Sequence, residues 1–101
     1  MQRRILEVHP EAVSEARAAR AWYERRSPAA AKAFVEELEA ALERILDAPE
    51  MYGTYLHRTR GCLLRRFPYL VVYRTTETTV QVIAVAHGRR KPGYWRFRFS
   101  V

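Results

Sequence analysis

A nearly unbroken apolar run late in the chain constrains the fold more than any other feature. Six of the seven residues from Val80 to Ala86 are apolar, and only Gln81 is polar. A strand that reads as a continuous apolar run is usually buried on both faces. We therefore predict a central strand over residues 79–86, with other parts of the chain covering both of its faces.

In the first half of the chain, apolar residues recur at the three- and four-residue spacing of helices. Pro10 at a first helical position predicts a helix from there to about Arg25. Ser27 as N-cap and Pro28 after it predict a second helix that ends near residue 47. The short link between the two predicts an antiparallel hairpin. Its apolar stripes contain Ala12, Val13, Ala16, Ala19, Trp22 and Tyr23 in the first helix, and Ala31, Phe34, Leu38, Ala41, Leu42 and Ile45 in the second, with Trp22 and Phe34 expected in the core.

Strand composition, rich in Val, Ile, Tyr, Phe and Thr, marks the remaining elements. It predicts strands over 5–8, 62–67 and 69–75 besides 79–86, with a loop over 51–61. The order β-α-α-β-β-β predicts an α+β fold, in which the helical hairpin packs on a twisted, mainly antiparallel sheet. A chain of 101 residues has room for one domain, here residues 1–101. The alternation Arg-Phe-Arg-Phe near the end fits either an extra strand or a frayed end.

Composition excludes several classes of protein. With 49% hydrophobic residues the chain can bury a core, which argues against disorder. Cys62 is the only cysteine, so neither an intrachain disulfide nor a cysteine-based metal site can form, and a reducing cytoplasm is expected. The sequence has no apolar run of about 18 residues and no signal-peptide pattern. We expect no cofactor, no metal and no membrane association.

The charge is divided unevenly between the two halves of the chain, whose formal net charge is +7. Residues 1–55 carry eight basic and ten acidic side chains, whereas residues 56–101 carry ten basic ones and only Glu77 as an acid. Sixteen of the eighteen basic residues are arginine, whose planar guanidinium suits carboxylates, phosphates and aromatic faces. The excess of arginine in residues 56–101 therefore predicts that this half of the chain binds an acidic partner. The alternative is a solvated, arginine-biased surface from a high-GC genome.

Four motifs together carry a family resemblance. They are Tyr23-Glu24 with Ser27-Pro28, Ala33-Phe34, Arg66-Phe67-Pro68-Tyr69-Leu70-Val71-Val72-Tyr73-Arg74, and Val82-Ile83-Ala84-Val85-Ala86-His87-Gly88-Arg89-Arg90-Lys91-Pro92. On these residues the chain resembles the RelE/ParE superfamily of toxins over about residues 5–96, and it is closer to the ParE-like branch. The resemblance implies the toxin half of a type II toxin–antitoxin pair, which stabilises plasmids or arrests growth. It also implies a hetero-oligomer with an antitoxin whose acidic C-terminal segment wraps the toxin.

The resemblance leaves the target open. RelE-like members cleave mRNA in the ribosome, and ParE-like members poison DNA gyrase. A metal-independent ribonuclease needs proton-transfer groups and fixed cations, for which the sequence offers His87, Arg65 and Tyr94. RelE-like ribonucleases usually place an arginine where this chain has Leu70, and they carry lysines ahead of that strand, whereas residues 33–90 contain none. These departures favour gyrase, with the ribonuclease as the alternative and a degenerate toxin that only binds antitoxin as a third hypothesis.

Binding to the antitoxin or the target is expected from arginines and aromatics of the second half. Aromatic side chains beside arginines make good binding anchors when exposed. The alternative interpretation is structural: His87 would be a hydrogen-bonded residue without a catalytic role, and Tyr94 and Trp95 would only cap the sheet. Arg65 and Arg66, as neighbours in a strand, should point to opposite faces. The expected binding residues are Arg66, Arg74, Arg89, Arg90, Tyr94 and Trp95.

Overall fold

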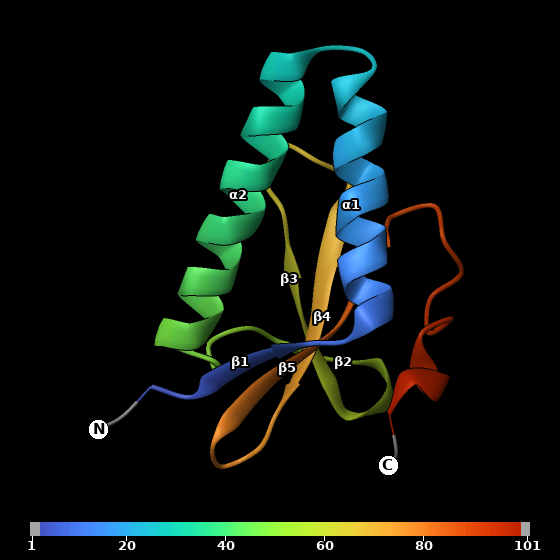
Figure 1. Ribbon diagram of the computed structural model, residues 1–101. Coiled ribbons are helices and arrows are strands. Elements are labelled where there is room, and N and C mark those ends of the chain that lie inside the picture. Colours follow the sequence, from blue (N-terminus) through green and yellow to red (C-terminus); the bar gives the residue numbers. More distant parts are fainter. Residues whose placement is uncertain (1–2, 100–101) are drawn as a thin grey trace.

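Two antiparallel helices lie against one face of a five-stranded sheet (Figure 1). The computed structural model describes residues 3–99. None of the helices in this part of the chain is long and apolar enough to cross a membrane. The elements are β1 (Ile5–Val8), α1 (Pro10–Glu24), α2 (Pro28–Asp47), β2 (Thr54–Tyr55), the 3₁₀ helix η1 (Leu56–Arg58), β3 (Thr59–Leu63), β4 (Tyr69–Thr75), β5 (Thr79–His87) and the 3₁₀ helix η2 (Arg96–Arg98). The predicted α+β class is confirmed.

Both helices begin at the prolines that the sequence indicated. At the start of α1, Nδ1 of His9 accepts a hydrogen bond from the backbone N–H of Glu11 at 3.0 Å, just ahead of Pro10. At the start of α2, Oγ of Ser27 accepts one from the backbone N–H of Ala30 at 3.2 Å, which confirms the predicted N-cap. The cap by His9 could not be predicted, because histidine is not among the residues that usually fill this position.

The predicted apolar strand is β5, and it lies inside the sheet, whose strand order is β1-β5-β4-β3-β2. It pairs antiparallel with β4 and parallel with β1, and the other pairs in the sheet are antiparallel. The pairing with β4 skips Ile83, which forms a β-bulge. Since β1 pairs only with residues 79–82, the second half of β5 has no strand beside it on that edge among the described residues.

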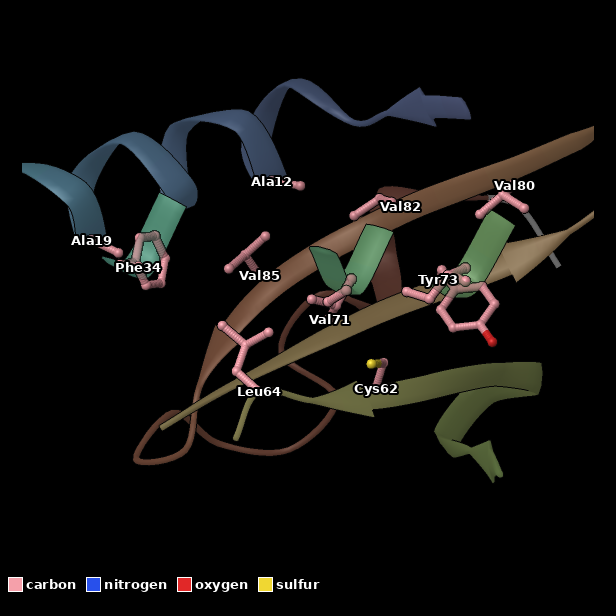
Figure 2. Close-up of a cluster of buried hydrophobic side chains, with 12 residues drawn as sticks. Ala12, Ala19, Phe34, Cys62, Leu64, Val71, Tyr73, Val80, Val82 and Val85 are labelled. Atoms are coloured by element: carbon pink, nitrogen blue, oxygen red, sulfur yellow. The ribbon is translucent and has the colours of Figure 1, made fainter. Parts of the chain in front are cut away.

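Both faces of β5 are buried, as the apolar run predicted. The core between the helices and the sheet includes Phe34, Val71 and Val85 (Figure 2). The segment after β5, residues 88–99, covers the opposite face, where Trp95 is 1% exposed. The buried residues of this second core are Val72, Ile83, Ala84, Ala86 and Trp95.

Four local expectations from the sequence differ from the structure. Trp22 is not in the core: 43% of its surface is exposed, and the guanidinium of Arg26 lies 3.5 Å from the centre of its ring. Residues 51–61 are not all loop, because they contain β2, η1 and the start of β3. The strand predicted over 62–67 ends at Leu63, and the chain then bends. The Arg-Phe-Arg-Phe segment is neither a strand nor frayed over its described part, where η2 forms; residues 100–101 lie outside the described residues.

The turn before β3 and the segment after β5 fit closely together. His57 and Arg58 both have positive φ angles, of 56° and 63°, in the left-handed region that non-glycine residues seldom adopt. Gly93, with φ of 82°, lies against this turn, and a Cβ there would stand 3.1 Å from Nε2 of His57. The ring of His57 also lies edge-on to Trp95, with 5.8 Å between ring centres. Position 93 therefore requires glycine both for its backbone conformation and for space.

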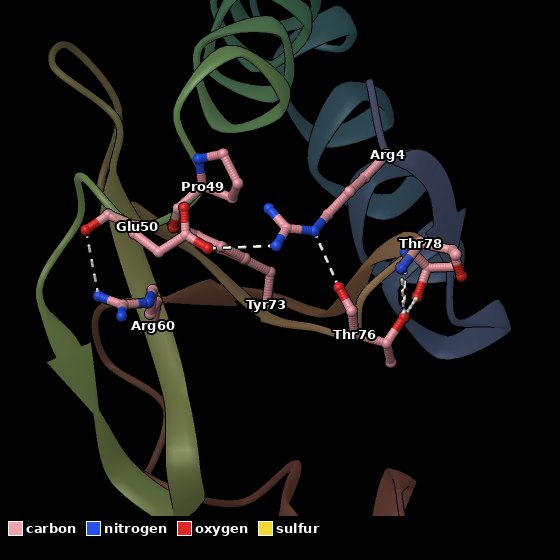
Figure 3. Close-up of polar contacts among 8 residues, drawn as sticks. Arg4, Pro49, Glu50, Arg60, Tyr73, Thr76 and Thr78 are labelled. Atoms are coloured by element: carbon pink, nitrogen blue, oxygen red, sulfur yellow. Dashed lines mark hydrogen bonds and ion pairs between the residues drawn. The ribbon is translucent and has the colours of Figure 1, made fainter. Parts of the chain in front are cut away.

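Polar contacts join Arg4, just before β1, to the turn after α2 and to the β4–β5 hairpin (Figure 3). Nε of Arg4 donates to the carbonyl oxygen of Thr76 at 2.8 Å, and its Nη2 lies 3.3 Å from Oε1 of Glu50. The hydroxyl of Tyr73 donates to the carbonyl oxygen of Pro49 at 2.6 Å. Burial raises the pKa of Tyr73 to about 12, so this hydroxyl remains a donor at neutral pH.

Candidate functional site

A groove of about 500 Å³ opens between α1 and the sheet end at which β4 begins and β5 finishes. We call it the α1–β5 groove. Its aromatic walls include Trp22, Tyr69 and Tyr94, and its cationic rim is formed by Arg89 and Arg90. Both arginines are exposed. The groove therefore combines apolar surface with positive charge, which suits a partner that is both apolar and acidic.

Strand pairing brings two arginine-bearing segments to this end of the sheet. Tyr69 pairs with His87, and their rings meet edge to face with 5.0 Å between centres. One residue beyond, the backbone N–H of Gly88 donates to the carbonyl oxygen of Pro68 at 2.8 Å. Residues 68–69 and 87–88 consequently lie side by side, although some twenty residues separate them in the sequence.

A carboxylate from α1 connects the walls of the groove. Glu15 accepts two hydrogen bonds from Arg98, at 2.8 and 2.9 Å, and one from the hydroxyl of Tyr94. Nη1 of Arg90 lies 3.9 Å from the same carboxylate. Burial would raise the pKa of Glu15, but the hydrogen bonds from Arg98, from Tyr94 and from the backbone of Val85 hold this pKa below its usual range. Glu15 is therefore ionised at neutral pH.

The same carboxylate also satisfies the open half of the β5 edge. The bulge turns the backbone groups of Ile83 and Val85 toward the side where β1 has already ended. The N–H of Val85 donates to Glu15 at 3.0 Å, and the carbonyl oxygen of Ile83 accepts from Nη1 of Arg98 at 3.1 Å. The ion pair thus supplies the hydrogen bonds that a neighbouring strand would otherwise make.

A second buried glutamate determines the path of the chain between β3 and β4. Oε2 of Glu37, on α2, accepts the backbone N–H groups of both Arg65 and Arg66, and its Oε1 accepts from Nε of Arg66 at 3.0 Å. Burial would raise the pKa of Glu37, yet the hydrogen bonds from these two arginines lower it. The two arginines therefore lie in a bend and not in a strand, so the prediction that they point to opposite faces of a strand is wrong.

Sequence reasoning did not identify either glutamate, although a local signal exists. Glu15 comes three residues after Ala12 and four before Ala19, both of which are buried. Glu37 has the same spacing from two buried residues of α2, Phe34 and Ala41. Side chains three and four apart share one face of a helix, so both carboxylates face the interior. A charged residue at this spacing inside an apolar stripe indicates a buried ion pair.

The structure gathers some of the predicted site residues and separates others. His87, Arg89, Arg90 and Tyr94 line the groove, and Arg66 is exposed two residues before Pro68 of its wall. Trp95 lies in the second core, so the prediction of an exposed anchor there is wrong: the sequence does not reveal that the chain folds back over the sheet.

The remaining predicted residues lie elsewhere. Arg74 is near the far end of β4, where Nε donates to Oε1 of Gln81 at 2.7 Å and the guanidinium lies 4.8 Å from the ring centre of Phe99. Arg65 is exposed in the bend after β3 and does not line the groove. The proposed catalytic set of His87, Arg65 and Tyr94 is thus only partly assembled in the groove.

The groove has specific chemical properties that bear on catalysis. Burial and the hydrogen bond to Glu15 raise the pKa of Tyr94, so its hydroxyl is a poor proton acceptor at neutral pH. Nδ1 of His87 already accepts a hydrogen bond from the backbone N–H of Arg89 at 3.0 Å. Within residues 3–99, no group of three or more histidine, cysteine, aspartate or glutamate residues is placed to hold a metal ion. His87 Nδ1 and the Tyr94 hydroxyl are thus both engaged in hydrogen bonds within the chain.

Comparisons with known proteins agree with this architecture. The family described as the ParE toxin of the type II toxin–antitoxin system parDE matches residues 6–92. The proteins named Toxin ParE2 of Mycobacterium tuberculosis strains CDC 1551 / Oshkosh and ATCC 25618 / H37Rv are each 36% identical over 55 residues, which is 54% of this chain and 52% of theirs. The match thus spans about half the length of these relatives.

A solved structure resembles most of the fold. It is described as the chromosomal ParDE TA system from P. aeruginosa, and it matches with a TM-score of 0.73 over 83% of this chain and 95% of that chain, at 15% identity. The fold is therefore shared even where the sequences have diverged. With the family match over residues 6–92, this confirms the resemblance seen in the sequence: the chain belongs to the ParE toxin family of type II toxin–antitoxin systems.

Proposed function

We propose that this protein arrests growth by acting on DNA gyrase, and that an antitoxin neutralises it by binding in the α1–β5 groove. Membership of the ParE family supports the toxin role. What favours gyrase over mRNA as the target is the position of the Glu15 carboxylate. It accepts the hydrogen bond of the Tyr94 hydroxyl and forms ion pairs with two arginines. A ribonuclease would need these groups for the phosphate and for proton transfer.

The antitoxin segment that fits the groove is acidic and partly apolar. Its carboxylates would meet Arg89 and the exposed part of Arg66, whose Nε is bound to Glu37, while its apolar side chains contact Trp22 and Tyr69. Arg89 has no carboxylate within 4.0 Å among the described residues, so it is available to a partner. Such a complex would form in the cytoplasm as a toxin–antitoxin hetero-oligomer. Its association would be fast at low salt and weaker at high salt.

Two assays with the purified protein distinguish the possible targets. Inhibition of negative supercoiling by gyrase, together with intact mRNA in a translating extract, is the expected result. Ribosome-dependent cuts in mRNA with normal supercoiling would refute the proposal in favour of the ribonuclease. Normal growth after induction, with neither effect, would instead favour a degenerate toxin that acts only as an antitoxin-binding module.

Charge reversal tests the groove itself. Arg89→Glu should weaken the affinity for the cognate antitoxin by at least about tenfold, because it places a negative charge where carboxylates are expected. Arg17→Glu is the matched control, since Arg17 is an exposed arginine of α1 that does not line the groove. Equal affinities of the two variants, measured by isothermal titration calorimetry, would exclude the groove as the antitoxin site.

A further inference from the structure

Apart from one residue, the α1–β5 groove has the features of a site for single-stranded nucleic acid. Such sites combine aromatic faces, on which bases stack, with arginines that follow the phosphates. Here Trp22 keeps 43% of its surface exposed although Arg26 covers one face of its ring. The guanidinium of Arg90 lies over the ring of Tyr94, 3.8 Å from its centre, and so places a cation on the aromatic wall. Arg89 adds a second exposed cation at the rim. Aromatic and cationic groups alone would therefore allow an RNA strand to bind.

The exception is Glu15, which carries the only carboxylate among the described residues that line the groove. Its side chain is 14% exposed, and that of Arg98, bound to both of its oxygens, is equally buried. Its Oε2 also lies 3.9 Å from Nη1 of Arg90. Two of the guanidiniums near the groove therefore already face a fixed negative charge, which leaves less attraction for a phosphate.

We propose that Glu15 is a specificity-determining residue that excludes nucleic-acid strands from the α1–β5 groove. This inference rests on the non-nucleolytic function proposed above. A phosphate bound to Arg90 would lie within a few ångströms of the Glu15 carboxylate, in a partly enclosed site where like charges repel more strongly than in water. A peptide avoids this repulsion, because it can place an apolar side chain over Glu15 and its carboxylates at the rim. A nucleic acid has a charged phosphate at every nucleotide and cannot.

The variant Glu15→Gln removes the negative charge while the side chain keeps nearly the same size and shape. The amide oxygen of glutamine can still accept from Val85 and Arg98, so the edge of β5 keeps its hydrogen bonds. The substitution removes the negative charge that faces Arg90 and Arg98, together with the hydrogen bonds that Oε2 accepts from Tyr94 and from Nη2 of Arg98. Glu39→Gln is the matched control, because Glu39 is an exposed glutamate of α2 outside the groove and changes the net charge by the same amount.

The test is the binding of a fluorescent single-stranded RNA of about 10 nucleotides to the purified protein, followed by fluorescence anisotropy. Glu15→Gln should bind at least about tenfold more tightly than the wild type and the Glu39→Gln control. The dependence of log K on log salt should steepen by about 0.7 for each new phosphate contact. Adding Arg90→Gln to Glu15→Gln should remove most of the gain, which a purely structural role of Glu15 would not predict.

Several outcomes would overturn the inference. One is that Glu15→Gln binds RNA no better than Glu39→Gln; another is that the gain persists without Arg90. Circular dichroism verifies that each variant is folded, and the double substitution Glu15→Gln with Arg98→Gln, in which one amide can donate to the other, replaces Glu15→Gln if the single amide beside Arg98 disrupts the fold. Because gyrase and ribosomes are absent from this assay, its failure leaves the proposed function standing. Tight RNA binding by the wild type, with mRNA cleavage on ribosomes, would reject both.

Discussion

Glu37 should contribute more to stability than any exposed charge on the helices, and Glu37→Gln tests this. Its side chain is 8% exposed and accepts the backbone N–H groups of Arg65 and Arg66 besides Nε of Arg66. Hydrogen bonds to a charged acceptor contribute about 1.5–3 kcal/mol each and neutral ones about 0.5–1.5 kcal/mol. Glutamine keeps one acceptor oxygen for the two backbone donors, so each of these bonds weakens by about 1 kcal/mol.

The ion pair with the guanidinium adds little to this sum. The side chain of Arg66 is 67% exposed, so its pairing with Glu37 is screened by solvent and contributes about 0.5 kcal/mol or less. We therefore expect Glu37→Gln to lower the free energy of unfolding by about 2 kcal/mol. For a domain of this size that corresponds to a fall in Tm of roughly 8–16 °C. Urea unfolding followed by circular dichroism at pH 7 measures the difference directly.

The pH dependence gives an independent measure of the same interaction. Because the pKa of Glu37 is lowered in the folded state, its charge stabilises the fold above the unfolded pKa of about 4.3. This stabilisation is lost as the pH falls through the folded pKa, so the gap between wild type and Glu37→Gln should narrow below about pH 4. Glu36→Gln is the control, since Glu36 is exposed and pairs only at 3.9 Å with Lys32. A gap below about 0.5 kcal/mol at pH 7, or one that does not change with pH, would refute the reasoning.

Two further substitutions test contacts that hold the sheet and the segment after β5. Tyr73→Phe removes the 2.6 Å hydrogen bond to the carbonyl of Pro49 and should cost about 1–3 kcal/mol in urea unfolding, because the buried oxygen loses its donor; an unchanged midpoint would contradict this. Gly93→Ala should cost about 1–2 kcal/mol, since its φ is 82° and the new Cβ would stand 3.1 Å from His57. In contrast, Gly53→Ala has open space around it and serves as the control, so equal effects of the two would argue against strain at Gly93.

The elements that could be predicted from the sequence are those determined by local signals. Pro10, Ser27 and Pro28 mark the starts of the two helices through capping and backbone restriction, which act within a single turn. The run from Val80 to Ala86 identified the central strand because burial on both faces requires apolar side chains throughout. These features depend on neighbours in the chain, so reading the sequence was sufficient.

The organisation of the site depends on contacts between distant residues, and so it could not be predicted in the same way. Glu15 is paired with Arg98, 83 positions later, and Glu37 with Arg66, 29 positions later. The uneven charge along the sequence correctly predicted that the second half is rich in arginine. It did not show that these arginines have different surroundings in the folded chain. In the folded chain some are bound by helix glutamates, whereas Arg89 is available at the rim of the groove.

The bulge at Ile83 has a consequence for how copies of this protein behave toward one another. A strand edge with unused backbone groups is a template for self-association, and the chain leaves such an edge where β1 stops short. Here Arg98 and Glu15 close it with side chains, so that no second molecule can extend the sheet at that point. We therefore expect that loss of either side chain would expose this edge and promote pairing between copies of the protein.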